Sequence, residues 1–217
     1  MSTRFDDAVI FTNTVTLAGP ASITANNITS SAAIARTQLA QDALKPFPIP
    51  FELFRVWNAY ETALPGTSSS DDLGLYGGTF GTGSQLIRTY DVKNAGAVTL
   101  YARVRAALPA EYDAGETITL RMKCGMVTTV ASASATVDVE CYKVNGEGGI
   151  GSDLCTTSAT TINSLTFANK DFTITPTGLV AGDVFDIRIT IAVNDSATAT
   201  AVIAAIGSCD LLCDVRG

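Results

Sequence analysis

Hydrophobic and polar residues alternate along several segments of the chain. In residues 98–105, Val, Leu and Ala occupy the even positions, while Thr, Tyr and Arg occupy the odd ones. Residues 117–123 and 184–191 follow the same two-residue period. A period of two is typical of strands with one buried face and one face in water. These segments are therefore predicted to be antiparallel strands.

Strand patterns recur throughout the chain after residue 50. Turn-forming Gly, Asn and Asp residues separate them, as at residues 94–96 and 113–115. The intervening sequence lacks the pattern of long amphipathic helices that a parallel sheet would require. An all-β fold follows: an antiparallel β-sandwich, with the jelly roll as its expected form. The expected strands are residues 51–57, 73–80, 86–92, 97–106, 117–126, 135–144, 165–174, 184–193 and 198–215.

The first 50 residues have a different pattern, in which apolar residues are widely spaced. Residues 11–17 alternate like a half-buried strand that ends at a Gly-Pro pair, and a short helix is expected from Ser30 or Ser31 to Leu44. Prolines at positions 46, 48 and 50 forbid helix and predict an extended connector. The chain is therefore predicted to contain an extended arm with its connector, residues 1–50, and a sandwich domain, residues 51–217.

Composition and charge narrow the range of functions. The chain has 217 residues, with 14 Lys and Arg against 21 Asp and Glu, and a net charge of −7. Nucleic acid and anionic membranes are therefore not expected as partners. No apolar run has the length of a signal peptide or membrane span. Histidine is absent, which removes the usual general base and metal ligand, so we expect no catalytic residue and no enzyme activity.

Acidic residues are the remaining candidates for chemistry. A glycosidase would need two of them to converge on its substrate, whereas turns and solvent-exposed strand faces account for them more simply. A calcium site in residues 145–153 is conceivable, although the Asp-x-Asp-x-Asp spacing is absent. The glycines of residues 74–83 precede a strand, which favours turns over a phosphate loop. The acidic candidates are Asp71, Asp72, Glu147, Asp153, Asp183 and Asp186.

The cysteines are odd in number and lie in apolar, strand-like surroundings, so we expect buried free thiols rather than disulfides or a zinc site. We expect neither a metal nor a cofactor. The five are Cys124, Cys141, Cys155, Cys209 and Cys213.

Aromatic residues gather just after the proline run. They could form core, a contact between subunits or a sugar contact, and at least two should be core. The cluster contains Phe47, Phe51, Phe54, Trp57 and Tyr60. Contact between subunits is assigned to the first four.

Residues 15–39 read VTLAGPASITANNITSSAAIARTQL. This segment resembles the low-complexity arms of tailed-phage capsid decoration (cement) and head-fibre proteins, over about forty residues and by composition. The resemblance implies a structural protein of the virion, made in the host cytoplasm, that binds the major capsid protein on the outer shell as a homotrimer. Capsid contact is then expected at the apolar residues of the arm: Phe5, Val9, Phe11, Val15, Leu17, Ile23, Ile28, Ile34 and Leu39.

The alternative function is a carbohydrate- or receptor-binding β-sandwich module of a phage tail or fibre. Sugar sites require planar aromatic rings beside polar side chains. The chain has one Trp and 7% aromatic residues, which is a small supply. A hydrolytic enzyme ranks third, for lack of histidine.

Overall fold

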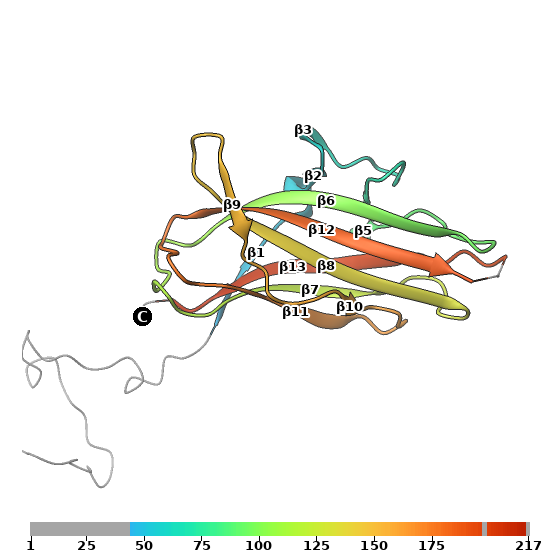
Figure 1. Cartoon of the computed structure of the whole chain (residues 1–217). Helices are drawn as coiled ribbons and strands as arrows, with labels where there is room; N and C mark the ends of the chain where they lie inside the picture. Colours follow the sequence, from blue (N-terminus) through green and yellow to red (C-terminus); the bar gives the residue numbers. More distant parts are fainter. Residues whose placement is uncertain (1–43, 197–198, 216–217) are drawn as a thin grey trace, which may run out of the picture. The chain divides into compact units, whose positions relative to one another are not determined.

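The computed structural model describes residues 44–196 and 199–215, which form a β-sandwich of two antiparallel sheets (Figure 1). The chain divides into two units, Met1–Gln41 and Asp42–Gly217, and the described residues belong to the second. The expected strand at 11–17, the expected helix and all nine capsid-contact residues from Phe5 to Leu39 lie outside the described residues. The predicted fold class is confirmed.

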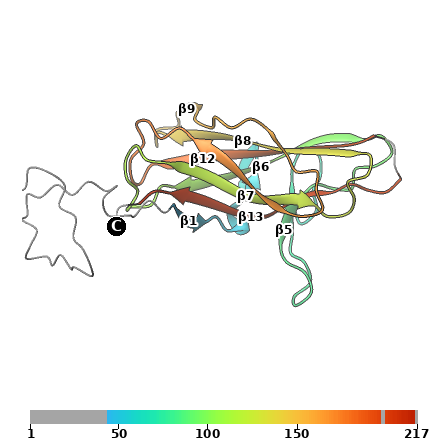
Figure 2. The ribbon, with the colours of Figure 1, turned by 90° about the horizontal axis from the view of Figure 1, so that it is seen from below.

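The first sheet, sheet A, has the strand order β11-β7-β13-β5-β4. Strand β5 pairs with Ala205 and Ile206 of β13, and β1 pairs further along the same edge, with Asp210–Cys213. The two strands therefore share one edge of β13, and Figure 2 shows β1 beside it. The strands are β1 (Lys45–Pro48), β4 (Gly74–Tyr76), β5 (Leu86–Arg88), β7 (Ile118–Met126), β11 (Ala168–Ile174) and β13 (Ala204–Cys213).

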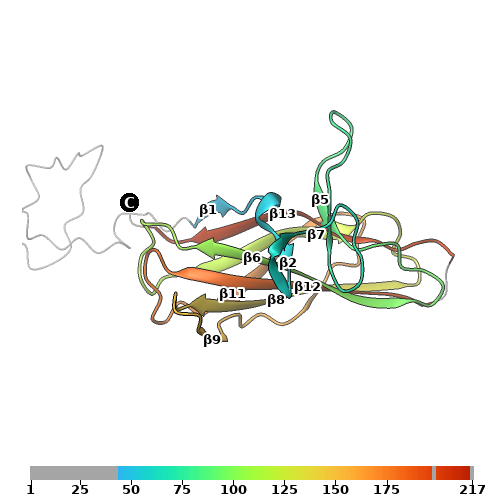
Figure 3. The same ribbon diagram turned by 90° about the horizontal axis from the view of Figure 1, so that it is seen from above.

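The second sheet, sheet B, has the order β10-β8-β12-β6-β2-β3, and β9 pairs with β8. Its centre is formed by three long strands, β8, β12 and β6, which are labelled in Figure 3 and are paired almost end to end. The strands are β2 (Arg55–Val56), β3 (Ala59–Ala63), β6 (Ala97–Ala107), β8 (Ala133–Val144), β9 (Ile150–Asp153), β10 (Thr160–Thr161) and β12 (Val184–Asp195).

The pairing between the main strands is nested. Strand β8 pairs with β10, β7 with β11, β6 with β12, and β5 with β13. Sheet A thus holds β5, β7, β11 and β13, while sheet B holds β6, β8, β10 and β12. Eight strands wound as nested antiparallel pairs across two sheets are a jelly roll.

The core lies between the inner faces of the sheets. In β12, Ile187, Ile189 and Ile191 are fully buried, and in β7 Leu120 and Met122 are fully buried. Fully burying one such side chain contributes about 1.5–3 kcal/mol, so the alternating isoleucines both set which face of β12 turns inward and stabilise the sandwich. The predicted alternation of β6, β7 and β12 is confirmed.

The proline run is part of the sandwich rather than a connector. Residues 45–48 form β1, and the N–H of Ile49 donates to the carbonyl of Cys209 at 2.9 Å. Prolines 46, 48 and 50 alternate with residues 45, 47 and 49, so the missing N–H groups fall on the side away from β13, as an edge strand tolerates. Residue 51 is therefore too late a start for the domain.

The predicted strand over residues 51–57 is wrong in its first half. Phe51–Leu53 form a 3₁₀ turn, closed by the N–H of Phe54 donating to the carbonyl of Phe51 at 3.1 Å. Only Arg55–Val56 of that segment form a strand, β2. The short strands β1, β3, β9 and β10 were not expected, since two to five residues are too few to show a two-residue period.

Candidate functional site

The outward-facing side of sheet B brings arginines, carboxylates and tyrosines together. Arg188 of β12 lies opposite Arg103 of β6 and Glu140 of β8. Two residues earlier on β12, Asp186 lies opposite Arg105 and Tyr142. Residues directly opposite in an antiparallel sheet point to the same face. Two adjacent rows across three strands therefore carry charged and aromatic side chains on the outer face of the sheet.

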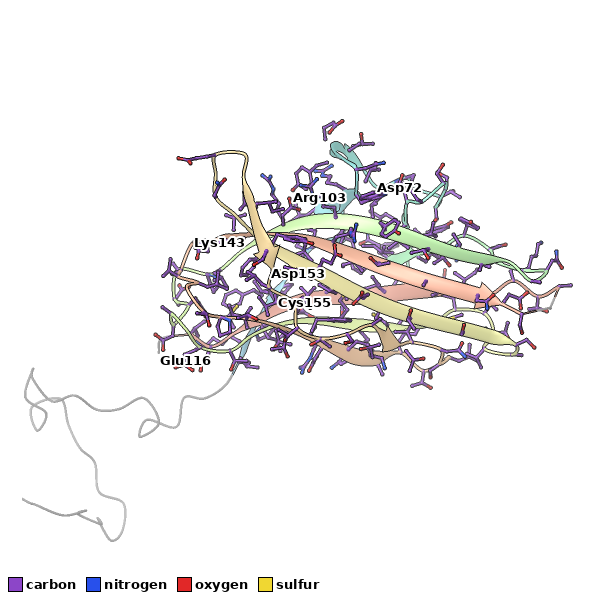
Figure 4. The ribbon with its side chains drawn as sticks, viewed as in Figure 1. Asp72, Arg103, Glu116, Lys143, Asp153 and Cys155 are labelled. Carbon is purple, nitrogen blue, oxygen red and sulfur yellow. The ribbon has the colours of Figure 1, made fainter. Side chains whose placement is uncertain are left out.

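Ion pairs fix the positions of these side chains. Arg103 binds Asp186 in bidentate fashion: its Nε donates to Oδ1 at 2.6 Å and its Nη2 donates to Oδ2. Asp186 is 5% exposed, and its hydrogen bond to Arg103 raises the pKa of that guanidinium. Arg188 pairs with Glu140 at 2.6 Å. Figure 4 labels Arg103 on the outer side of β6.

Three aromatic rings border the ion pairs. The rings of Trp57 and Tyr101 lie 5.0 Å apart, inclined by 46°. The guanidinium of Arg188 lies 5.7 Å and 5.2 Å from these two ring centres, within the range of a cation–π interaction. Tyr60 lies 5.1 Å from the guanidinium of Arg103 and from that of Arg105. The arginines are thus held between carboxylates and ring faces.

The indole of Trp57 is fixed at its polar edge. Its Nε1 donates to Asp71 Oδ2 at 2.9 Å, so the ring cannot turn freely about its bond to the backbone. The neighbouring Asp72 has a pKa raised by burial and then by the charge of Asp71. Trp57 therefore presents a partly buried ring whose orientation is set before any ligand binds.

Two adjoining hollows form a groove on this face. A hollow of about 300 Å³ lies beside Trp57, Glu140, Tyr142 and Arg188. The other, of about 190 Å³, lies beside Arg105, Val144 and the glycines of the β8–β9 loop. Arg103, Ile150 and Asp186 line both. We call the joined hollows the sheet B groove.

The β8–β9 loop forms one wall of the groove. In Figure 1 it stands above the sheet made by β6, β12 and β8, as does the segment that carries β3. The side chain of Asn145 closes the loop, since its Oδ1 accepts from the N–H groups of Glu147 and Gly149 at 2.9 and 2.8 Å. Gly146 has a φ of 76° and Gly148 one of 84°, a conformation that favours glycine. The loop that could have held calcium is therefore closed by its own backbone and Asn145.

The same sheet face continues beyond the groove. A shallow hollow of about 290 Å³ lies over Thr99 of β6, Ala192 of β12 and Thr136 of β8, where small side chains replace the arginines and tyrosines. From Asp186 to Asn194, β12 advances eight residues, or about 26 Å at the rise of a strand. The face therefore offers an extended surface, with charged and aromatic side chains at one end.

The predicted subunit-contact residues lie in different places. Phe51 and Phe54 are 8% and 1% exposed, and their rings pack edge to face, 6.0 Å apart. Side chains buried in the core of one chain offer nothing to a neighbour, so assigning them to subunit contact is wrong, while the expectation of at least two core aromatics is confirmed. Phe47 is half-buried on β1, and Trp57 lies in the groove.

Two of the predicted acidic candidates outside the groove, Asp153 and Asp183, are held by hydrogen bonds. Asp153 Oδ1 accepts from the N–H groups of Cys141 and Cys155 at 2.9 Å each. Asp183 pairs with Lys143 at 2.7 Å and also accepts from the N–H of Val180. Figure 4 labels Lys143 and Asp153 at the end of the sandwich near β9. The structure does not bring these acids together as a pair.

Sequence reasoning missed most of the groove. It singled out Trp57 and Asp186 but not Arg103, Arg105 or Arg188. The alternation had placed Arg103 and Arg105 on the polar side of one strand and Arg188 on that of another. The register between the strands brings these arginines together, and the sequence pattern of one strand alone does not reveal that register.

All five cysteines are free thiols, four of them buried and Cys155 partly so. Burial raises the pKa of Cys124 and that of Cys213 to about 12. The expected buried thiols are confirmed for these four residues. Within residues 44–196 and 199–215, no three Cys, Asp or Glu side chains gather as metal ligands. No helix in this described part is long and apolar enough to cross a membrane.

No protein-family model matches the sequence, and no curated protein matches it. Among solved structures, the chain is similar to the CBM22-1 xylan-binding domain of Xyn10C from Paenibacillus barcinonensis, at 11% identity, 82% of this chain, 100% of that chain and a TM-score of 0.37.

Two further structures are similar over a comparable share of this chain. They are the CBM22-1-GH10 modules of xylanase 10B from Clostridium thermocellum (10% identity, 81% of this chain, 28% of that chain, TM-score 0.36) and the Stig cyclase Fisc from Fischerella sp. TAU (13%, 81%, 91%, 0.38). Identities and TM-scores this low leave function to be argued from the groove itself.

Proposed function

We propose that the sandwich is a non-catalytic glycan-binding module and that the sheet B groove holds the sugar. The observation that carries this proposal is the ring of Trp57, with Tyr101 packed beside it, set against three arginines and two carboxylates in an open groove. A sugar ring has C–H faces that pack on aromatic rings and hydroxyl edges that bond charged and polar groups. Binding sites of this kind combine an apolar surface with a few placed polar groups.

The side chains of the groove are ordered in advance. Arg103 and Arg188 each hold a carboxylate, and the indole of Trp57 is bonded to Asp71. Immobilising a long side chain on binding costs about 0.5–1.5 kcal/mol. Ion pairs that already fix these side chains reduce that cost, which supports a recognition role.

The two carboxylates of the groove also favour binding over hydrolysis. Glycoside hydrolysis requires one carboxyl group to give its proton to the leaving oxygen. Asp186 is bonded by Arg103 through both oxygens, and Glu140 is paired with Arg188. Neither is free for that role.

Affinity electrophoresis of the full-length protein through gels that contain neutral and acidic plant, algal and bacterial polysaccharides tests the proposal. We expect retardation in at least one gel, and Trp57→Ala should lose at least tenfold in affinity, as central aromatic residues do in other interfaces. Tyr76→Ala is the matched control, since Tyr76 lies in sheet A with the guanidinium of Arg88 3.4 Å from its ring centre. Equal losses in both variants, or no retardation in any gel, would contradict the proposal.

A second candidate function rests on the sequence of residues 15–39. We propose that this segment attaches the protein to the outer surface of a phage capsid, through the major capsid protein, and that a homotrimer strengthens the attachment. Three arms on one oligomer can raise binding by about a hundredfold or more when all engage at once. The two functions are compatible, because a module attached by its arm can present a groove to glycans.

Co-sedimentation with capsids tests this second function. The full chain should sediment with them, and a chain that begins at Asp42 should not. Light scattering of the full chain gives the oligomeric state, for which a stable monomer would contradict the trimer.

A further inference from the structure

We infer that the ligand of the sheet B groove is an acidic polysaccharide, whose uronate carboxylates pair with Arg105. This inference rests on the glycan-binding function proposed above and names its substrate class. It depends on the charge of the groove, on the free hydrogen-bond donors of one arginine and on the shape of the hollow beside it.

The groove is cationic in an acidic protein. Its lining contains three arginines, Arg103, Arg105 and Arg188, against two carboxylates, Glu140 and Asp186. A fourth arginine, Arg55 of β2, lies opposite Arg103 on the same face. The chain as a whole carries −7. At physiological ionic strength charges more than about 8 Å apart are largely screened. A bound polymer therefore interacts with the charges of the groove rather than with the net charge of the chain.

Of the three arginines that line the groove, Arg105 is the one without a close ion pair. Both oxygens of Asp186 are bonded to Arg103, and the Nε of Arg105 lies 4.0 Å from the nearer of them. Among the residues that the structure describes, the guanidinium of Arg105 donates no hydrogen bond, and the side chain is 46% exposed. Arg188, by comparison, is paired with Glu140 at 2.6 Å through Nη2, while its buried Nε has no hydrogen-bond partner among the described residues.

The surroundings of Arg105 fit a carboxylate. Its guanidinium lies beside the ring of Tyr60 and lines the hollow of about 190 Å³ under the β8–β9 loop. A guanidinium offers two parallel N–H donors that match the two oxygens of a carboxylate. A neutral sugar would add nothing to the 4.0 Å contact that Arg105 makes with Asp186, whereas a uronate supplies a second carboxylate and keeps its C–H face for the aromatic rings.

Four acidic groups near this position are each paired or hydrogen-bonded. Asp186 is the nearest acid and is neutralised by Arg103, while Glu140 is neutralised by Arg188. Asp71 accepts the indole N–H of Trp57, and Lys143 pairs with Asp183. The excess positive charge therefore belongs to Arg105, with Arg55 beside the groove.

The experiment compares polygalacturonate with the same polymer fully methyl-esterified, in which each carboxylate is replaced by a neutral ester on an unchanged sugar backbone. Full-length protein is measured by titration calorimetry with both polymers at 50 and 200 mM NaCl. We expect the acid polymer to bind at least tenfold tighter, and the difference to shrink at the higher salt. Arg105→Gln should abolish the difference while binding of the methyl ester persists, and Arg105→Lys should restore part of it. Arg121→Gln, at an exposed arginine of sheet A, is the control.

Each contradicting result would overturn a different claim. Equal binding of acid and ester by the wild type would overturn the acidic ligand and leave glycan binding intact. Binding of no polymer would overturn the proposed function itself. Dextran sulfate binding as tightly as polygalacturonate would overturn recognition of the carboxylate. An effect of Arg121→Gln equal to that of Arg105→Gln would overturn the assigned position.

Discussion

Asp186→Asn should destabilise the sandwich because it removes the charge that Arg103 requires. Asp186 is 5% exposed, it accepts two hydrogen bonds from Arg103, and Arg105 lies 4.0 Å away. Asparagine has nearly the same shape, so the packing around position 186 is retained. What is lost is the negative charge between two guanidinium groups.

The size of the effect follows from burial. Breaking a fully buried ion pair costs about 3–5 kcal/mol. The side chain of Arg103 remains 29% exposed, so water can solvate part of its charge, and the asparagine oxygen still accepts one bond. We therefore expect a loss of about 2 kcal/mol in the free energy of unfolding. With a urea dependence of about 2 kcal/mol per molar, the midpoint should fall by about 1 M.

Urea unfolding followed by circular dichroism measures this shift. Asp171→Asn is the matched control, because Asp171 makes the same bidentate pair with Arg121, at 2.7 Å for both bonds, but on an exposed face. Its midpoint should hardly change, since exposed ion pairs contribute little. Equal shifts in the two variants would refute the argument from burial, as would an unchanged midpoint in Asp186→Asn.

Three further predictions concern the sandwich. Gly125→Ala should lower the free energy of unfolding by about 1–2 kcal/mol, because an added Cβ would lie 2.5 Å from the ring of Phe167. Gly207→Ala is the control, since its Cβ would lie 3.4 Å from the same ring and should change the free energy of unfolding little; equal urea midpoints in the two variants would contradict the prediction. A chain that begins at Asp42 should melt cooperatively at the temperature of the full chain in calorimetry, whereas one that begins at residue 51 should melt lower, because it lacks β1. Burial raises the pKa of Cys124 from 9.0 to about 12, so the contribution of this thiol to stability is complete below pH 9 and is lost as the pH rises toward 12. The urea midpoint should therefore decline less between pH 8 and 11 in Cys124→Ala than in the wild type, and an equal decline would contradict this prediction.

The long strands could be predicted from the sequence because the alternation of apolar and polar residues in each strand shows which of its faces is buried. Residues 97–106 and 184–193 were expected as strands, and they correspond to Ala97–Ala107 and Val184–Asp195. Ten or more residues with a two-residue period leave little ambiguity. The nested pairing also follows the order of the strands, since successive strands from β5 to β8 and from β10 to β13 alternate between the two sheets.

Edges and loops were harder to predict. The proline run was expected as a connector, because proline removes backbone donors, yet its spacing of two leaves every other N–H facing β13. The groove was missed for a related reason. Its arginines become neighbours only through cross-strand register, as Arg188 does with Arg103, and that register is a property of two strands together.

The place of β13 in sheet A has a consequence for how the polypeptide acquires its structure during synthesis. This strand lies between β7 and β5 and also pairs with β1, although it is translated after all of them. Arg88 pairs with Ala205, although the two residues lie far apart in the sequence. Closing so long a loop opposes the pairing and slows folding. While residues 204–213 are still inside the ribosome, the emerging chain exposes unpaired edges of β1, β5 and β7. Those edges can join with other nascent chains, so aggregation is favoured until the central strand of sheet A arrives.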